Sequence, residues 1–163
     1  MNGTIGTALT TATALSAGVT GGVYVAFSAM VLPALRTLPA ADAVAAMQRI
    51  NVAAVRPPFM ALFFGGAALS VGLVVAELST GPFTGRGLTR VLGASLALAS
   101  FGLTVAANVP LNNALARVTP AGTGAAEGWQ AFNDGWSRAN LIRAGAAITG
   151  AALLTGSLLI APN

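Results

Sequence analysis

Residues 57–76 read PPFMALFFGGAALSVGLVVA, a run of twenty positions without a single Asp, Glu, Lys or Arg. A helix needs about 20 apolar residues to cross the roughly 30 Å of hydrocarbon in a bilayer. Three further stretches are equally free of charge and at least as long, namely residues 1–35, 91–116 and 144–163. Together the four stretches predict a membrane protein with four spanning helices.

The composition supports this class for the whole chain. Hydrophobic residues make up 55% of the 163 positions, charged residues only 7%, and the mean hydropathy is +0.78. Soluble domains of this size carry far more charge. We therefore expect a single integral membrane domain over residues 1–163, all-α, built as a four-transmembrane-helix bundle with little mass outside the lipid.

Proline, glycine and charged residues indicate where each element begins and ends. We expect spans over approximately residues 4–32, 57–77, 88–108 and 141–160. Two amphipathic interfacial helical segments, approximately residues 38–55 and 126–140, are expected in the long connections. At the first of these, Asp42, Arg49 and Arg56 recur seven residues apart on one helical face.

The basic residues indicate an orientation in the membrane. All eight are Arg; six lie in the two long connections, and Arg86 and Arg90 lie in the short one. The positive-inside rule then predicts cytoplasmic long connections, with both termini on the other side. The net charge of +4 is too small and too scattered for a nucleic-acid surface. We expect the lipid bilayer as the partner, in a bacterial inner membrane.

The sequence lacks the usual ligands of metal and redox centres. It contains no Cys and no His, and its carboxylates are far apart in sequence: Asp42, Glu77, Glu127 and Asp134. Thiol chemistry, iron–sulfur clusters and His-ligated iron therefore have no ligands here. We expect neither a metal site nor a cofactor.

Small residues recur every four positions in the first expected span, at Ala14, Gly18, Gly22 and Ala26. Such a ridge allows a neighbouring helix to approach closely. It would serve either for packing inside the bundle or for a homo-oligomer, and the sequence leaves both open.

Five residues before and within the last span follow helical spacing: Trp129, Phe132, Trp136, Asn140 and Arg143. Steps of three and four residues place them on one face of a helix. One interpretation is an aromatic belt at headgroup level with a snorkelling Arg. It fits Asn140 and Arg143 less well, because polar groups that deep usually face a cavity or a partner.

Amide side chains form a second polar group. Asn108 and Asn112 flank Pro110 at the end of the third span, where they either satisfy helix-terminal carbonyls or point into the bundle. Two amphipathic segments and two span ends should meet at one mouth of the bundle. We expect a polar-mouthed cavity there, bounded by Gln48, Asn51, Asn108, Asn112, Trp136, Asn140 and Arg143.

These motifs resemble a known membrane family. The element Asn108-x-Pro110-x-Asn112, the aromatic-to-Arg stripe, the exit Pro33-Ala34-Leu35 and the pair Met47-Gln48 with Asn51 carry the resemblance. The family is the four-span group of unknown function that includes the anthrone oxygenases of polyketide pathways. The resemblance covers nearly the whole chain.

The resemblance implies an oxygenase without a cofactor, in which the anion of a phenolic substrate reacts directly with dioxygen. Such a site needs an apolar slot, aromatic walls and fixed donors for the substrate oxyanion. If the resemblance holds, we expect Arg143, Asn108 and Asn140 to act as the catalytic donors and Trp129, Phe132 and Trp136 to wall the slot. From the predicted bundle mouth, we add Asn112, Gln48 and Asn51 as ligand-binding residues. The sequence offers no convincing general base.

Two functions therefore stay open. In the first, the protein binds a planar apolar or phenolic ligand at one bundle mouth and oxygenates it. In the second, it is a non-catalytic membrane assembly or structural protein that uses its small-residue faces. A transporter is disfavoured, because no intramembrane carboxylate suits proton coupling. Small molecules retained on purification would separate these functions.

Overall fold

The computed structural model describes residues 3–80 and 85–161, and every regular element in those ranges is a helix. The first rod consists of α1 (Gly3–Ala26), the π-helical turn η1 (Phe27–Val31) and α2 (Leu32–Leu35). It is followed by α3 (Ala40–Ala54) and α4 (Phe59–Leu78). The second rod consists of α5 (Gly85–Leu103), the π-helical turn η2 (Thr104–Asn108) and α6 (Val109–Ala116). The last helix is α7 (Ala125–Ser157).

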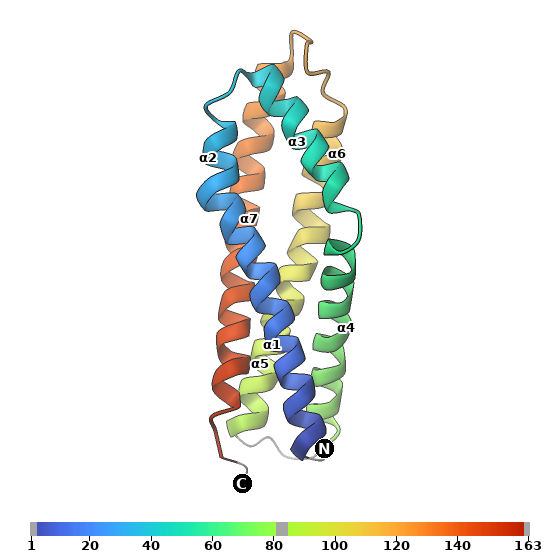
Figure 1. The fold of residues 1–163 in the computed structure, drawn as a ribbon, viewed down its shortest axis with the longest axis vertical. Coiled ribbons are helices and arrows are strands. Elements are labelled where there is room, and N and C mark those ends of the chain that lie inside the picture. Colours follow the sequence, from blue (N-terminus) through green and yellow to red (C-terminus); the bar gives the residue numbers. More distant parts are fainter. Residues whose placement is uncertain (1–2, 81–84, 162–163) are drawn as a thin grey trace.

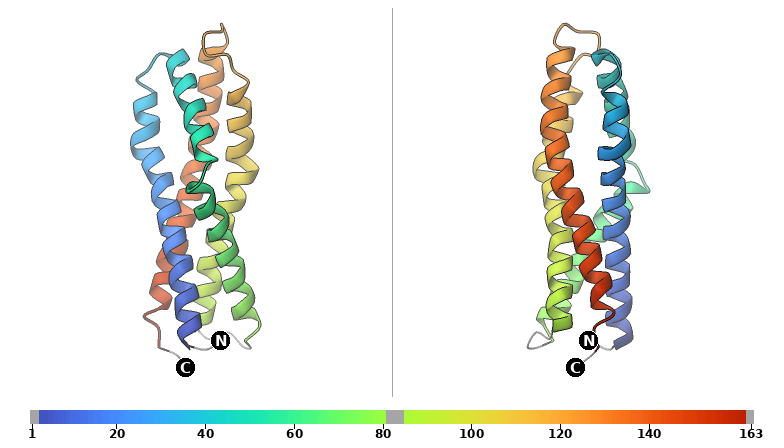
Figure 2. Two further views of the ribbon diagram at one scale, coloured as in Figure 1. Left: turned by 45° about the vertical axis from the view of Figure 1, so that its right-hand side comes forward. Right: turned by 90° about the vertical axis from the view of Figure 1, so that its left-hand side faces the viewer.

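These elements form one elongated bundle (Figure 1). One half contains α1, α4, α5 and the end of α7, and the other half contains α2, α3, α6 and the start of α7 (Figures 1 and 2). α7 packs against both α1 and α5 over much of its length. The first and last described residues lie at the same end of the bundle, opposite the start of α3.

Three helices among the described residues are long and apolar enough to cross a membrane: Gly3–Leu35, Phe59–Leu78 and Gly85–Ala116. The fourth expected span, residues 141–160, overlaps the last part of α7, which ends at Ser157. α7 is not among the three helices that meet both criteria. The all-helical class is confirmed, and the count of four spans stays a prediction.

Pro33 and Pro110 lie within continuous rods, although the sequence suggested that the spans end near them. A proline inside a helix lacks an N–H, and its ring clashes with the carbonyl four residues back. Each of these prolines comes two residues after a π-helical turn, and the wider turn relieves that clash. The rods therefore continue past the expected limits of residues 32 and 108.

The rods are longer than a bilayer requires. At 1.5 Å per residue, the 33 residues of Gly3–Leu35 measure about 50 Å, against roughly 30 Å of hydrocarbon. The 20 residues of α4 match the hydrocarbon thickness. The half of the bundle that contains α4 therefore suits the membrane interior, and the half that contains α3 extends beyond it.

The two segments expected to lie at the interface adopt different arrangements. α3 packs lengthwise against α6 and α7, with Val44 and Met47 buried and Asp42 and Arg49 exposed. The second segment, residues 126–140, continues without a break into the rest of α7. The amphipathic segment and the span that follows it are thus one 33-residue helix in α7, whereas α3 and α4 are two separate helices.

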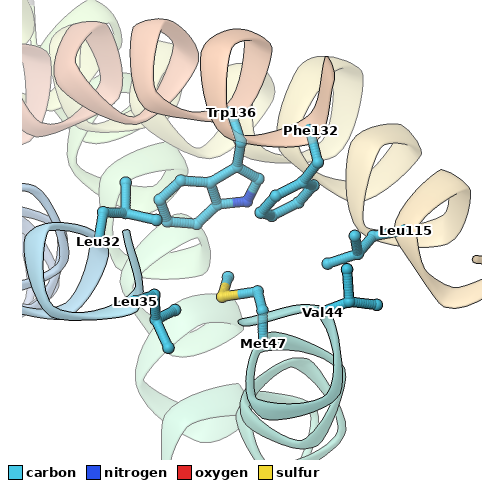
Figure 3. Close-up of a cluster of buried hydrophobic side chains, with 7 residues drawn as sticks. All are labelled: Leu32, Leu35, Val44, Met47, Leu115, Phe132 and Trp136. Carbon is cyan, nitrogen blue, oxygen red and sulfur yellow. The ribbon is translucent and has the colours of Figure 1, made fainter. Parts of the chain in front are cut away.

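Two groups of buried apolar side chains stabilise the two halves. The larger group lies between α2, α3, α6 and α7 and contains Leu32, Leu35, Val44, Met47, Leu115, Phe132 and Trp136 (Figure 3). The smaller group contains Ala14, Leu73, Ala94 and Leu154. The expected bundle mouth is therefore filled by apolar side chains.

Small residues hold α5 against α7 in the half that contains α4. A Cβ placed on Gly93 would lie 2.9 Å from the carbonyl oxygen of Gly150, and one on Gly150 would lie 2.7 Å from that of Gly93. The expected ridge of α1 is divided. A Cβ on Gly18 would lie 3.8 Å from Ala151 of α7, whereas one on Gly22 would meet nothing within 4 Å. Part of the ridge thus packs within the bundle.

Candidate functional site

Arg143 lies in the interior of the bundle and is 5% exposed. Its Nε and Nη2 donate to Asn140 Oδ1 at 3.0 and 2.8 Å, and its Nη1 donates to Thr104 Oγ1 at 3.2 Å. Within residues 3–80 and 85–161, no carboxylate forms an ion pair with it. A guanidinium carries five N–H groups, so two of them remain for another acceptor.

Aromatic rings cover the Arg143 guanidinium. Its Cζ lies 3.9 Å from the ring centroid of Tyr24 and 4.9 Å from that of Trp136. Trp136 is fixed in turn, because its Nε1 donates to Asn112 Oδ1 at 2.9 Å. Cation–π contacts of this kind strengthen when water is excluded. Ring faces and neutral oxygens thus surround the charge.

Asn140 connects α7 to the first rod. It is fully buried, and its Nδ2 donates to the carbonyl oxygen of Tyr24 and to Ser28 Oγ, both at 2.8 Å. Ser28 belongs to η1, and Thr104, which accepts from Arg143, belongs to η2. The Asn140–Arg143 pair therefore lies between the two π-helical turns, a feature frequently found at functional sites.

Hydroxyl groups complete the cluster. Thr104 Oγ1 donates to the carbonyl oxygen of Ser100 at 2.9 Å and lies 3.3 Å from the Tyr24 hydroxyl. Ser100 Oγ donates to the carbonyl oxygen of Arg143 at 2.9 Å. Three helices therefore contribute to one polar cluster inside the bundle.

Asn108 carries an unsatisfied acceptor beside this cluster. It is 1% exposed, and its Nδ2 faces the carbonyl oxygen of Trp136 at 3.4 Å. Only the amide NH₂ can donate to that carbonyl, so the side-chain oxygen must point elsewhere. This Oδ1 is buried and has no hydrogen-bond partner. Such a group invites a donor from a ligand or from water.

A cavity of about 30 Å³ adjoins the cluster on the side of α4. Tyr24 and Ser100 belong to both. The cavity is lined by Ser16, Ala17, Thr20, Tyr24, Phe63, Gly66, Ala67, Ser70, Ala97, Ser100, Phe101 and Ala147. It has room for one or two water-sized molecules. A drug-sized ligand occupies a pocket of several hundred Å³, so a three-ring compound does not fit.

Five of the predicted site residues come together. Arg143 and Asn140 form the centre, Trp136 covers it, and Asn108 and Asn112 contact Trp136. α7 supplies Arg143, Asn140 and Trp136, η2 supplies Asn108, and α6 supplies Asn112.

The other four predicted residues lie among packed side chains. Gln48 Nε2 donates to the carbonyl oxygens of Leu115 and Val118 at 2.9 and 2.8 Å, which anchors α3 to the end of α6. Phe132 is buried between Trp129 and Trp136, at centroid distances of 5.8 and 6.0 Å. Asn51 is half-buried on α3.

The sequence analysis missed Tyr24, Thr104 and the serines beside them. A signal was present, because polar residues recur every four positions in two spans. Thr20, Tyr24 and Ser28 follow this spacing in the first rod. Ser100, Thr104 and Asn108 follow it in the second. Each set forms a polar stripe on one helical face, and Tyr24 is the only Tyr of the chain.

The opposite end of the bundle holds a separate ion pair. Arg90 Nη1 donates to Glu77 Oε1 at 2.8 Å, with the two side chains 8% and 11% exposed. Among the residues that the structure describes, no group of three or more His, Cys, Asp or Glu could hold a metal ion. Buried Arg90 thus has a carboxylate partner, whereas buried Arg143 has none among the described residues.

Comparison with known proteins identifies the family. The profile described as anthrone oxygenase matches residues 59–153, which is more than half of the chain. The match includes Arg143, Asn140, Asn108 and the residues around them, but it does not include Tyr24. No curated protein and no solved structure matches the chain. With its apolar helices and this match, the chain belongs to the anthrone oxygenase family of membrane proteins.

Proposed function

We propose that this protein binds a planar phenolic or anthrone-type ligand as its anion at Arg143 and catalyses the reaction of that anion with dioxygen. One observation carries the proposal. A buried guanidinium has no carboxylate partner among the described residues and keeps two N–H groups unused. A buried charge of this kind gains most from an anionic ligand, because a buried ion without a counter-ion is costly.

The chemistry needs little more than a fixed cation. An anthrone has a methylene carbon between two aryl rings, and loss of a proton there gives an anion whose charge rests largely on the ring oxygen. Arg143 would hold that oxygen through charge-assisted hydrogen bonds. The carbanion form bonds to dioxygen, the resulting hydroperoxide loses water, and a quinone remains. One anthrone and one dioxygen give one quinone and one water.

Tyr24 is the residue that we assign to proton transfer. Its hydroxyl is the one titratable O–H in the described part of the cluster, and it shares a hydrogen bond with Thr104. Its ring contacts the guanidinium that would hold the substrate oxygen. The neutral hydroxyl would donate its proton to the peroxide anion that forms when the carbanion bonds to dioxygen, and it would regain a proton from the next ligand that is deprotonated.

Under this proposal, the described structure would be a closed form of the site. The cavity beside the cluster is far smaller than three fused rings. The ligand would enter by displacing side chains between α3 and α7, where Met47 packs near Trp136 (Figure 3). Met adapts readily, because it is unbranched and has three rotatable bonds. We place this mouth at the surface of a bacterial inner membrane.

A structural role is the second candidate, and the same network supports it. Arg143 and Asn140 tie both π-helical turns to α7, which alone would stabilise the bundle. In that case the polar cluster would serve assembly of the helices, and an added phenol would have no effect on the protein.

Turnover of a dihydroxyanthrone separates the two candidates. The protein, in lipid nanodiscs, is mixed with the compound, and dioxygen consumption and quinone absorbance are recorded together. Arg143→Gln is compared with Arg138→Gln, a matched change at an exposed position of the same helix. We expect one dioxygen per quinone for parent and control, and a loss of about 100-fold for Arg143→Gln. Two outcomes would favour the structural role. In the first, the parent oxidises the compound no faster than protein-free nanodiscs do. In the second, Arg143→Gln oxidises it at the same rate as the control.

A further inference from the structure

The cavity beside Tyr24 and Ser100 has a size and a wall that select a small apolar molecule. Its volume of about 30 Å³ suits a diatomic molecule or a pair of waters. Phe63, Phe101 and several alanines supply the apolar part of the wall. Four helices contribute, namely α1, α4, α5 and α7, so the cavity lies between these helices at the level of α4.

Four of the five hydroxyl groups of the wall are already engaged, and the hydroxyl of Thr20 is the exception. Ser70 Oγ donates to the carbonyl oxygen of Gly66 at 2.8 Å, and Ser100 Oγ donates to that of Arg143 at 2.9 Å. Ser16 Oγ donates to the carbonyl oxygen of Leu62 at 3.4 Å, and the Tyr24 hydroxyl contacts Thr104. A buried water typically needs about three hydrogen bonds, including donors. Four of the hydroxyl hydrogens point to other acceptors, and only Thr20 keeps a donor free. One free donor is fewer than a buried water typically uses, which favours an apolar molecule.

The position of the cavity relates it to Arg143. Ala147, which lines the cavity, comes four residues after Arg143 and therefore lies one turn away on the same face of α7. The Tyr24 ring contacts the guanidinium and also lines the cavity. A molecule in the cavity is thus separated from an anion on Arg143 by about one helical turn, roughly 6 Å.

We propose that this cavity is a dioxygen site that supplies the oxidant to the anion held at Arg143. Dioxygen is diatomic and apolar, and it dissolves better in hydrocarbon than in water, so it reaches an intramembrane cavity from the lipid. The role of the site in catalysis rests on the proposed function, whereas binding of the gas does not. No bond forms in the cavity itself: dioxygen is stored there and reacts at the bound anion.

Dioxygen is paramagnetic, so its binding is measurable without turnover. The probe is dioxygen itself, applied under pressure to the protein in nanodiscs, with argon as the reference. The measured quantity is the added relaxation of alanine methyl signals. Ala147 lines the cavity, whereas Ala94 is buried elsewhere in the bundle. We expect the added relaxation to be several-fold larger at Ala147 than at Ala94.

Two matched substitutions test the location. Ala97→Val adds two methyl groups to the cavity wall, and Ala99→Val makes the same change at an exposed position of the same helix. Ala97→Val should reduce the relaxation at Ala147 to the level at Ala94, and Ala99→Val should leave it unchanged. Equal relaxation at Ala147 and Ala94 in the parent would overturn the proposal. The proposal would also be overturned if Ala147 showed water-to-methyl Overhauser effects but no added relaxation from dioxygen, because water would then occupy the cavity.

Kinetics then test the role in the reaction. We expect Ala97→Val to raise the KM for dioxygen several-fold relative to Ala99→Val. The affinity for the dihydroxyanthrone should be the same in both variants. An unchanged KM for dioxygen would overturn the supply role even if the gas binds. A protein that shows the relaxation but oxidises no anthrone would overturn the proposed function and leave the gas site standing.

Discussion

Asn140 is the residue whose loss should damage the buried cluster most. Its side chain makes four hydrogen bonds: it accepts twice from Arg143 and donates to the carbonyl oxygen of Tyr24 and to Ser28. The substitution Asn140→Leu keeps a side chain branched at the same carbon and removes all four hydrogen bonds. Because Arg143 stays, the change leaves a buried guanidinium with one remaining protein acceptor, Thr104.

The magnitude follows from the partners. A hydrogen bond to a charged group contributes about 1.5–3 kcal/mol, and Asn140 accepts two of them from Arg143. Hydrogen bonds between membrane helices average only about 0.6 kcal/mol, which lowers the expectation for the two neutral bonds. We therefore expect Asn140→Leu to reduce the free energy of unfolding by about 3 kcal/mol.

Equilibrium unfolding in mixed micelles measures this quantity. Asn113→Leu, at an exposed amide of α6, is the control and should change stability by less than about 0.5 kcal/mol. The double variant Asn140→Leu/Arg143→Leu should lose less than the sum of the single changes, by at least about 1 kcal/mol, because the stranded charge is gone. Additive losses, or a cost below about 1 kcal/mol for Asn140→Leu, would refute the account of the cluster.

Four further outcomes are expected. Gly93→Ala should lower the free energy of unfolding by about 2 kcal/mol, because its Cβ would meet the backbone of Gly150. Gly102→Ala, on the same helix with nothing within 4 Å of the added Cβ, should instead be neutral or stabilising in the same assay. Tyr24→Phe should retain ligand binding but lower turnover by about 100-fold, measured as quinone formation, if the hydroxyl transfers the proton. A reporter fused to the C-terminus should be active outside the cytoplasm, and activity only inside it would reverse the orientation inferred from the Arg distribution.

Much of the fold was predictable from simple patterns. Uncharged stretches of twenty residues or more gave the long helices, because length and apolarity alone decide whether a helix suits the membrane. The steps of three and four between Trp136, Asn140 and Arg143 placed them on one face, since helical periodicity is a local property. The same reasoning connected them with Asn108 at the neighbouring span end.

The remaining features depend on packing between distant segments. The π-helical turns before Pro33 and Pro110 keep the rods continuous, although proline is ordinarily a helix-ending signal. α3 fills the expected mouth with Val44 and Met47, and an amphipathic pattern does not say which partner covers the apolar face. Tyr24 was overlooked because its role depends on a partner 119 positions later in the chain.

Binding of a dihydroxyanthrone under argon tests the central claim most directly, because it isolates anion recognition from oxidation. Isothermal titration compares the parent with Arg143→Lys and with Arg138→Lys, the same change at an exposed position of α7. The account predicts that Arg143→Lys binds roughly tenfold more weakly, since a compact ammonium cannot reproduce the guanidinium fork, and that Arg138→Lys binds like the parent. Equal affinity in all three proteins, or no binding to the parent, would contradict an anion site at Arg143.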